Sequence, residues 1–151
     1  FLLPIPENNN NVSLKDCFNL YFNDEVLEGD NEWYDEKNKL KKKVNKRVKV
    51  WEFPEILIIC LNRFNKNLTK NNKMVAFDLD LDLTKYSLTK KKYNYELVSI
   101  CNHYGNTNSG HYTAMCNVNN LWYEFNDSSV NKIDKTTIST NNAYCLFYMR
   151  K

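Results

Sequence analysis

Apolar and polar residues alternate with a period of two through much of the chain, which predicts a protein built mainly from short strands. The alternation is clearest over 75–83 and 111–118. Asn119–Asn120 separates the latter segment from 121–125, as in a tight hairpin. Short, hairpin-like spacing favours an antiparallel sheet of about seven strands. The extended segments expected are 1–6, 55–64, 75–83, 93–104, 111–118, 121–125 and 143–149.

Helical periodicity is confined to short stretches. Ser13 is a good N-cap and precedes apolar residues at helical spacing, namely Leu14, Cys17, Phe18, Tyr21 and Phe22. A single helical turn is expected over 134–139. Runs of polar residues at 8–11, 66–73, 85–92 and 105–110 predict loops. The fold class that follows is α+β.

Residues 56–61 form a continuous apolar run of strand length, which predicts a central strand buried on both faces. By contrast, 32–49 predicts a solvated hairpin-like ribbon, because eight of the thirteen residues from Lys37 to Lys49 are Lys or Arg. A contact surface for an acidic partner is an alternative reading of this ribbon. A nucleic-acid-binding ribbon is less well supported, since interleaved aromatic residues are missing.

Length and composition narrow the class of protein. A chain of 151 residues with 42% hydrophobic residues can bury a core as one domain or a large part of one. A net charge of +3 is too small to indicate nucleic acid, and no apolar run approaches a membrane span. Without an initiator Met or a signal peptide, the chain is expected to be a segment of a longer protein. Five cysteines, an odd number without a Cys-x-x-Cys pair, predict free thiols in a reducing compartment, the cytoplasm or nucleus.

The candidate chemistry centres on His111, which follows Ser109–Gly110. A hairpin turning at Asn119–Asn120 would place His111 opposite Ser128, with Asn126 and Asp127 nearby. Either side chain could accept a hydrogen bond from one ring nitrogen and leave the other free to take a proton. A Cys–His–Asn relay needs this arrangement, together with a thiol. The second histidine, His103, is more often a structural residue in such a position.

Several motifs in chain order resemble the ubiquitin-specific proteases, which are papain-like cysteine peptidases (ubiquitin carboxyl-terminal hydrolases). Ser-Gly-His-Tyr-Thr-Ala at 109–114, Trp-Tyr-Glu-Phe-Asn-Asp-Ser-Ser-Val at 122–130 and Ala-Tyr-Cys-Leu-Phe-Tyr at 143–148 resemble the histidine box of that family. Further similarities lie at 1–6, 13–22, 54–64, 77–81 and 93–104. The resemblance implies the C-terminal portion of one catalytic domain, with 1–53 as a finger and helix region and 54–151 as a palm sheet.

The resemblance also implies roles for individual residues. His111 would be the general base, Asn126 the residue that orients it, and Asp127 a helper for the catalytic water and the oxyanion. The channel for the Gly-Gly tail of ubiquitin would be lined by Gly110, Tyr112, His103 and Tyr104.

Two features depart from the family pattern. The cysteine box is absent, and Cys17, Cys60, Cys101, Cys116 and Cys145 are poor candidates for the nucleophile. The finger zinc site is also not supported, because Asp35 and Asn38 stand where one Cys-x-x-Cys pair is expected. No cofactor and no metal are therefore expected.

The resemblance implies a deubiquitinase that cleaves the bond after the terminal glycine of ubiquitin. The expected partners are ubiquitin, ubiquitinated proteins and the N-terminal half of the same catalytic domain, which would supply the cysteine. The segment alone is expected to be inactive. The rival expectation is a non-catalytic ubiquitin-binding or scaffold module with the same fold.

Overall fold

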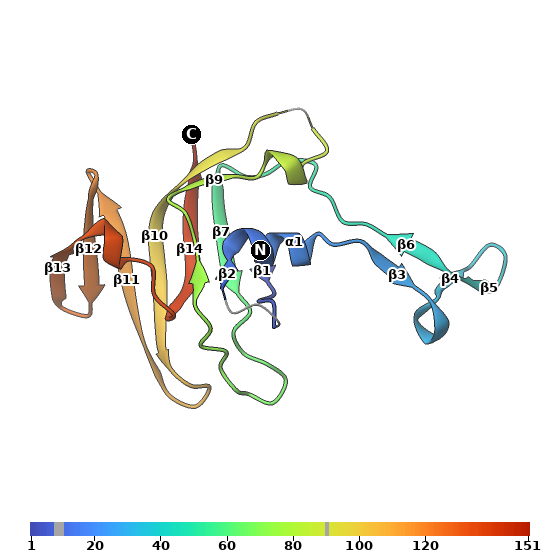
Figure 1. Cartoon of the computed structure of the whole chain (residues 1–151), viewed down its shortest axis with the longest axis horizontal. Coiled ribbons are helices and arrows are strands. Elements are labelled where there is room, and N and C mark those ends of the chain that lie inside the picture. Colours follow the sequence, from blue (N-terminus) through green and yellow to red (C-terminus); the bar gives the residue numbers. More distant parts are fainter. Residues whose placement is uncertain (8–10, 90) are drawn as a thin grey trace.

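A computed structural model describes residues 1–7, 11–89 and 91–151 (Figure 1). Strands dominate the described residues, and helical structure is short, so the α+β prediction is confirmed. The helical elements are α1 (Leu14–Tyr21) and the 3-10 turns η1 (Gly29–Asn31), η2 (Thr84–Tyr86) and η3 (Lys135–Thr137). The strands are β1 (Leu2–Leu3), β2 (Val12–Ser13), β3 (Glu25–Leu27), β4 (Trp33–Asp35), β5 (Leu40–Lys42), β6 (Val44–Lys46), β7 (Ile56–Leu61), β8 (Val75–Ala76), β9 (Asp80–Asp82), β10 (Asn94–Gly105), β11 (Gly110–Val118), β12 (Leu121–Asn126), β13 (Ser129–Ile133) and β14 (Ala143–Arg150).

The main sheet has the strand order β1-β7-β14-β10-β11-β12-β13, with β9 also paired to β10. Its pairs are antiparallel as predicted, except that β1 runs parallel to β7. Four consecutive strands, β10 to β13, form a meander at one side of the sheet (Figure 1). Both histidines lie on this meander, His103 on β10 and His111 on β11.

The helix α1 begins where the sequence predicts. Ser13 Oγ accepts a hydrogen bond from the amide of Asp16, and the Asp16 carboxylate accepts from the amide of Ser13, which completes a capping box. The buried face of α1 joins the same apolar cluster as the inward-facing residues of β7. The residues that α1 and β7 bury in this cluster are Leu14, Cys17, Phe18, Leu57, Ile59 and Leu61.

The prediction that β7 is buried on both faces is wrong. The strand is central, since it pairs with β1 and β14, but burial alternates along it. Ile56 and Ile58 are 62% and 47% exposed, whereas Leu57 and Ile59 are buried. An apolar run marks a strand, but it does not show whether one or both of its faces are covered.

Two further strand predictions need correction. The expected strand over 75–83 is interrupted, because β8 pairs with β2 while β9 pairs with β10. The strand β13 was not expected; it pairs with β12 after a turn at Asp127–Ser128. All but the last of its residues are exposed, so it lacks the apolar alternation that identifies a half-buried strand.

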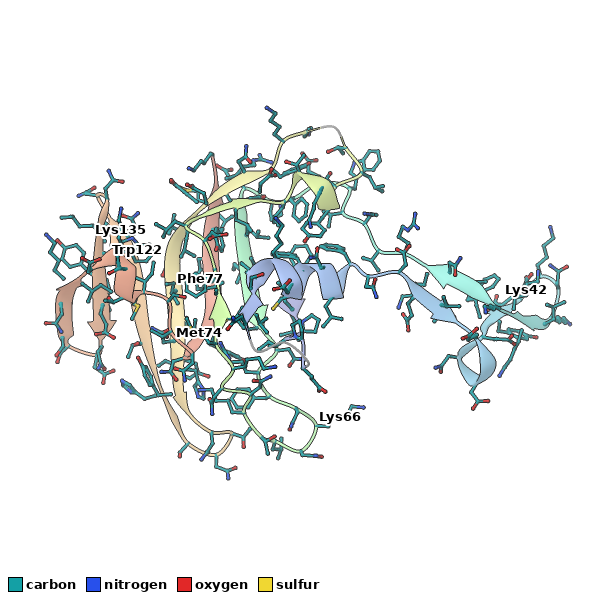
Figure 2. All side chains as sticks on the ribbon, viewed as in Figure 1. Lys42, Lys66, Met74, Phe77, Trp122 and Lys135 are labelled. Carbon is teal, nitrogen blue, oxygen red and sulfur yellow. The ribbon has the colours of Figure 1, made fainter. Side chains whose placement is uncertain are left out.

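The lysine-rich segment forms a ribbon that extends away from the main sheet, with Lys42 near its far end (Figures 1 and 2). It consists of two small antiparallel pairs, β4 with β5 and β3 with β6, and β3 lies outside the predicted range 32–49. Several of its basic side chains form ion pairs with neighbouring carboxylates. These pairs are Lys42–Asp35, Lys43–Glu28, Lys46–Glu25 and Arg47–Asp24. Within the described ranges, no helix is long and apolar enough to cross a membrane.

Candidate active site

The hairpin β11–β12 fixes the position of His111. Asn119 and Asn120 have φ angles of +52° and +64°, as a two-residue type I′ turn requires. The strands pair from Val118 with Leu121 to Ala114 with Phe125, which is the register predicted from the sequence. Because side chains alternate between faces, this register puts His111 on the same face as Asn126, one diagonal step away.

His111 and Asn126 are joined by a hydrogen bond between their side chains. The distance from His111 Nε2 to Asn126 Oδ1 is 2.7 Å. An amide oxygen only accepts hydrogen bonds, so Nε2 carries the proton and donates it. The other ring nitrogen, Nδ1, then holds the lone pair that can accept a proton. Both residues are exposed, so the ring is open to a group brought against it.

Asp127 lies next to Asn126 in the turn between β12 and β13. Its φ is +49°, in the left-handed region that Asp and Asn adopt more readily than most residues. Asn126 and Ser129 are paired across this turn. The exposed Asp127 is therefore held beside the histidine–amide pair by a short turn between two strands.

The end of the β10–β11 hairpin requires glycine at two positions. Gly105 pairs with Gly110, so the loop is shorter than the predicted 105–110. Gly105 has a φ of +99°, and an added Cβ would lie 2.4 Å from the carbonyl oxygen of Ser109. A Cβ on Gly110 would lie 2.3 Å from His103 Nε2 and 2.7 Å from the carbonyl oxygen of Tyr104. Backbone and imidazole therefore pack directly against Gly110.

His103 is buried, unlike His111. Its ring lies against Phe64, Tyr112 and Tyr144, and no hydrogen-bond partner for its buried Nδ1 is found among the described residues. Burial, and then the positive charge of Lys70, lowers the pKa of His103, which favours the neutral imidazole. His103 is thus in a different environment from a solvent-facing base.

The four residues expected in the substrate channel are neighbours of His111 in the β10–β11 ladder. Tyr104 pairs with His111 across the β10–β11 ladder, and His103 pairs with Tyr112. His103, Gly110 and Tyr112 line one surface hollow, and Tyr112 is 56% exposed. Phe64 and the loop residues Asn106 to Ser109 complete this hollow. Because side chains alternate along β11, this hollow lies on the face of the hairpin opposite to the His111 side chain.

A buried polar network beneath the hairpin was not anticipated from the sequence. Asn102 is fully buried; its Nδ2 donates to Thr113 Oγ1 at 3.5 Å, and its Oδ1 accepts from Thr140 Oγ1 at 3.3 Å. Thr113 is buried and lies two residues after His111 on β11. Polar residues in an otherwise apolar strand signal such a network, but their partners lie on other strands and cannot be read from one segment.

Arg63 is a second buried polar group without a sequence-based prediction. Only 1% exposed, it donates from Nε to the Ala143 carbonyl at 2.7 Å and from Nη1 to the carbonyls of Asn71 and Lys73 at 2.9 and 2.8 Å. These bonds connect the end of β7, the 71–73 segment and the start of β14. The sequence feature that could have indicated this buried group is a charged residue just after the end of an apolar strand.

The five cysteines are free thiols. Cys17 is buried in α1, and burial raises its pKa to about 11. Cys60, Cys145 and Cys101 lie on the neighbouring strands β7, β14 and β10, and Cys116 lies near the C-terminal end of β11. Among the described residues, no hydrogen bond joins a cysteine thiol to His111.

Asp35 and Asn38, which stand where the family has zinc ligands, take part in hydrogen bonds within the ribbon. The Asp35 carboxylate accepts from the amides of Lys37 and Asn38, the Asn38 side chain and Lys42 Nζ. In the part of the chain that the structure describes, no group of three or more His, Cys, Asp or Glu residues could hold a metal ion.

Comparisons with known proteins match nearly the whole chain. The family model described as ubiquitin carboxyl-terminal hydrolase matches residues 7–148. Ubiquitin carboxyl-terminal hydrolase 9 of Arabidopsis thaliana is 37% identical over 147 residues, covering 92% of this chain and 16% of the relative. Human ubiquitin carboxyl-terminal hydrolase 21 is 36% identical over 154 residues, covering 97% of this chain and 27% of the relative. The chain thus spans between about a sixth and a quarter of these relatives.

Comparison with solved structures points to the same family. The SAGA DUB module of Ubp8, Sgf11, Sus1 and Sgf73 bound to monoubiquitin aligns with a TM-score of 0.84 at 28% identity, over 99% of this chain and 35% of that chain. A yeast SAGA DUB module with an Sgf73 mutant aligns with a TM-score of 0.85 at 27% identity, over 99% of this chain and 34% of that chain. The fold is therefore the papain-like fold of the ubiquitin-specific proteases. The chain belongs to the ubiquitin carboxyl-terminal hydrolase family and forms part of a ubiquitin-specific protease domain.

Proposed function

We propose that this chain supplies the general base of a thiol-dependent deubiquitinase, which hydrolyses the peptide or isopeptide bond after the terminal glycine of ubiquitin. The observation that carries the proposal is the hydrogen bond from His111 Nε2 to Asn126 Oδ1. This bond leaves Nδ1 as the proton acceptor. The nucleophilic cysteine is proposed to come from the N-terminal half of the same catalytic domain. The chain covers only about a third of the structures it resembles.

The proposed reaction runs in two halves. His111 Nδ1 takes the proton of the cysteine thiol, and the thiolate attacks the carbonyl carbon of the terminal glycine. The imidazolium then gives its proton to the leaving amine, and ubiquitin remains as a thioester. In the second half, Nδ1 takes a proton from water, the hydroxide oxygen attacks the thioester, and the thiol is released. Asn126 orients the ring through both halves because an amide stays uncharged.

Asp127 is proposed to help in the second half of the reaction. Its exposed position beside Asn126 places a carboxylate where it can accept a hydrogen bond from the attacking water. This hydrogen bond would hold the water and polarise it for attack on the thioester carbon, where the oxyanion develops. Asn126 and Asp127 thus have separate roles, the first toward the ring and the second toward the water.

The substrate tail is proposed to run over the hairpin end formed by Gly110, Tyr112, His103 and Tyr104. Gly110 has no side chain, and its packing against His103 and Tyr104 leaves no room for one on that side. A Gly-Gly tail suits such a surface, because its backbone can approach closely without side chains of its own. Monoubiquitin is bound in one of the related structures, and ubiquitin and ubiquitinated proteins are the partners proposed here.

No cofactor is needed for this chemistry, and the ribbon is proposed to form without metal. Five free thiols accord with a reducing compartment, so the cytoplasm or nucleus is the proposed location. The alternative function is a non-catalytic ubiquitin-binding module of the same fold. The paired His111 and Asn126 favour the enzyme, because a binding module has no use for an oriented, exposed imidazole.

A ubiquitin derivative with a C-terminal electrophile tests where the nucleophile lies. The 151-residue chain alone should stay unlabelled, and the full-length protein should be labelled on a cysteine outside these residues. Labelling of any of the five cysteines named above would overturn the assignment. Binding of the full-length protein to ubiquitin without any labelling would favour the non-catalytic module.

A further inference from the structure

Two cysteines outside the relay face each other across neighbouring strands. Cys60 on β7 and Cys145 on β14 are direct partners in the ladder, although 85 positions separate them in the sequence. Their Sγ atoms lie 2.9 Å apart, and both residues are partly exposed. The proposed hydrolysis uses neither thiol, so their juxtaposition calls for a separate account.

The backbone at this pair is of the type that permits a disulfide. The Cys60 amide donates to the carbonyl of Phe1, the residue just before β1, at 2.7 Å, so it points away from β14. Cys60 and Cys145 are therefore a non-hydrogen-bonded antiparallel pair, in which Cα atoms are about 4.5 Å apart and side chains are closest. Disulfides span Cα separations of about 4.4–6.8 Å. A covalent bond can thus form here without moving either strand.

Cys101 is the competing partner, since it pairs with Cys145 from the other side, on β10. The backbone N–H and C=O groups of Cys145 point away from β7 and therefore toward β10. Paired residues whose backbone groups face each other stand farther apart than a non-hydrogen-bonded pair. The ladder is also irregular immediately after Cys101. The Cys101 thiol instead lies against the carbonyl oxygen of Asn102 at 3.9 Å. Cys60 is therefore the better-placed partner for Cys145.

We propose that Cys60 and Cys145 form an oxidative modification site, at which a hydroperoxide converts the two thiols into a disulfide between β7 and β14. One sulfur attacks the peroxide, the O–O bond breaks, and a sulfenic acid and an alcohol (water, for hydrogen peroxide) result. The second sulfur displaces hydroxide from the sulfenic acid, and water leaves. Two electrons and two protons pass from the thiols to the peroxide.

Either thiol can be the first to attack the peroxide. Burial, together with the contact with Cys60, raises the pKa of Cys145, which disfavours its thiolate. Closing a loop of this length reduces the conformational freedom of the unfolded chain, so the disulfide should raise the midpoint of thermal unfolding.

Peptide mapping of the 151-residue chain after treatment with hydrogen peroxide tests the proposal. Digestion without reduction should yield a cross-linked peptide pair containing Cys60 and Cys145, and the unfolding midpoint should rise. Cys101→Ser is the matched control and should retain both results, whereas Cys60→Ser and Cys145→Ser should lose both. Circular dichroism of the reduced variants shows that they are folded.

Two outcomes would overturn the proposal. One is that Cys60 and Cys145 remain free to alkylation, or are each over-oxidised, while the chain is folded. The other is that the cross-link joins Cys145 to Cys101. Neither outcome depends on hydrolytic activity, so the test is independent of the proposed function.

Discussion

His111 donates a hydrogen bond from Nε2 to Asn126 Oδ1 over 2.7 Å, and the two residues come from adjacent antiparallel strands. The bond fixes both the tautomer and the plane of an exposed ring. It depends on a turn of two residues, Asn119 and Asn120, whose positive φ angles set the register. A shift by one residue would move Asn126 to the other face of the sheet.

Replacing the orienting amide should affect the rate more than substrate binding. In the full-length protein, Asn126→Ala should lower kcat by about 10²-fold with little change in KM, because the ring loses its fixed orientation. Steady-state hydrolysis of a fluorogenic ubiquitin amide measures both constants. Asn131→Ala, at an exposed position on β13, is the matched control. Equal losses in both variants would remove the special role of Asn126.

A carboxylate at the same position should change the pH dependence. Asn126→Asp keeps the acceptor but adds a negative charge beside the ring, which favours the imidazolium. The acidic limb of the pH–rate profile should then move to higher pH. NMR of the imidazole resonances at a series of pH values compares the isolated wild-type and variant chains without requiring turnover. A pH–rate profile in the variant that is unchanged or moves to lower pH would contradict the contact between His111 and residue 126.

Part of this site was predictable because it depends on local patterns. Asn119–Asn120 between two alternating segments predicts the hairpin, and the hairpin predicts which residues face His111. Ser13 likewise predicts the start of α1. The remaining features depend on partners distant in sequence. Ile56 and Ile58 are apolar but exposed, and an apolar run cannot show which of its faces is covered.

The interruption of the strand expected over 75–83 has a similar cause. The segment keeps its alternation, but β8 and β9 pair with different strands, and alternation carries no information about partners. Asn102 and Thr113 give no local sign of the bond between them. For β13, pairing with β12 makes a strand of residues that are nearly all exposed. Tertiary pairing thus overrides the local pattern at these positions.

Gly110 should not tolerate a side chain. Gly110→Ala would bring a Cβ to 2.3 Å from His103 Nε2 and 2.7 Å from the Tyr104 carbonyl oxygen, so strands or rings must shift. The expected loss of folding free energy is about 1–3 kcal/mol, measured by urea unfolding of the chain. Gly29→Ala is the control: nothing lies within 4 Å, and only its φ of +63° opposes the change. The expected cost there is about 1 kcal/mol.

A Gly110→Ala variant as stable as the wild type would show that the hairpin end is not packed as described. A similar loss in both glycine variants would indicate backbone conformation rather than contact with His103 and Tyr104. A larger loss at Gly110 supports the close approach on which the proposed tail-binding surface rests.

The ribbon should lose order in acid. Hydrogen bonds from Lys42, and then from Asn38, lower the pKa of Asp35 to about 2. A carboxylate with a depressed pKa stabilises the fold above its unfolded pKa of about 4. This contribution is lost as the pH falls toward about 2. The amide resonances of Lys37 and Asn38, which donate to Asp35, should shift through that window.

Asp35→Asn should remove this transition, because the amide does not titrate. Asp30→Asn, at an exposed position in η1, is the matched control and should leave it in place. Resonances of Lys37 and Asn38 that stay constant down to pH 2 in the wild type would contradict the network around Asp35.

The most direct test of the central claim is the turnover number of the full-length protein carrying His111→Ala, with a fluorogenic ubiquitin amide as substrate. Loss of a general base should lower kcat by about 10²–10⁴-fold. Asn131→Ala, measured in parallel, should leave the rate unchanged, and circular dichroism should show both variants folded. Turnover of His111→Ala close to that of the wild type would contradict the assignment of His111 as the base.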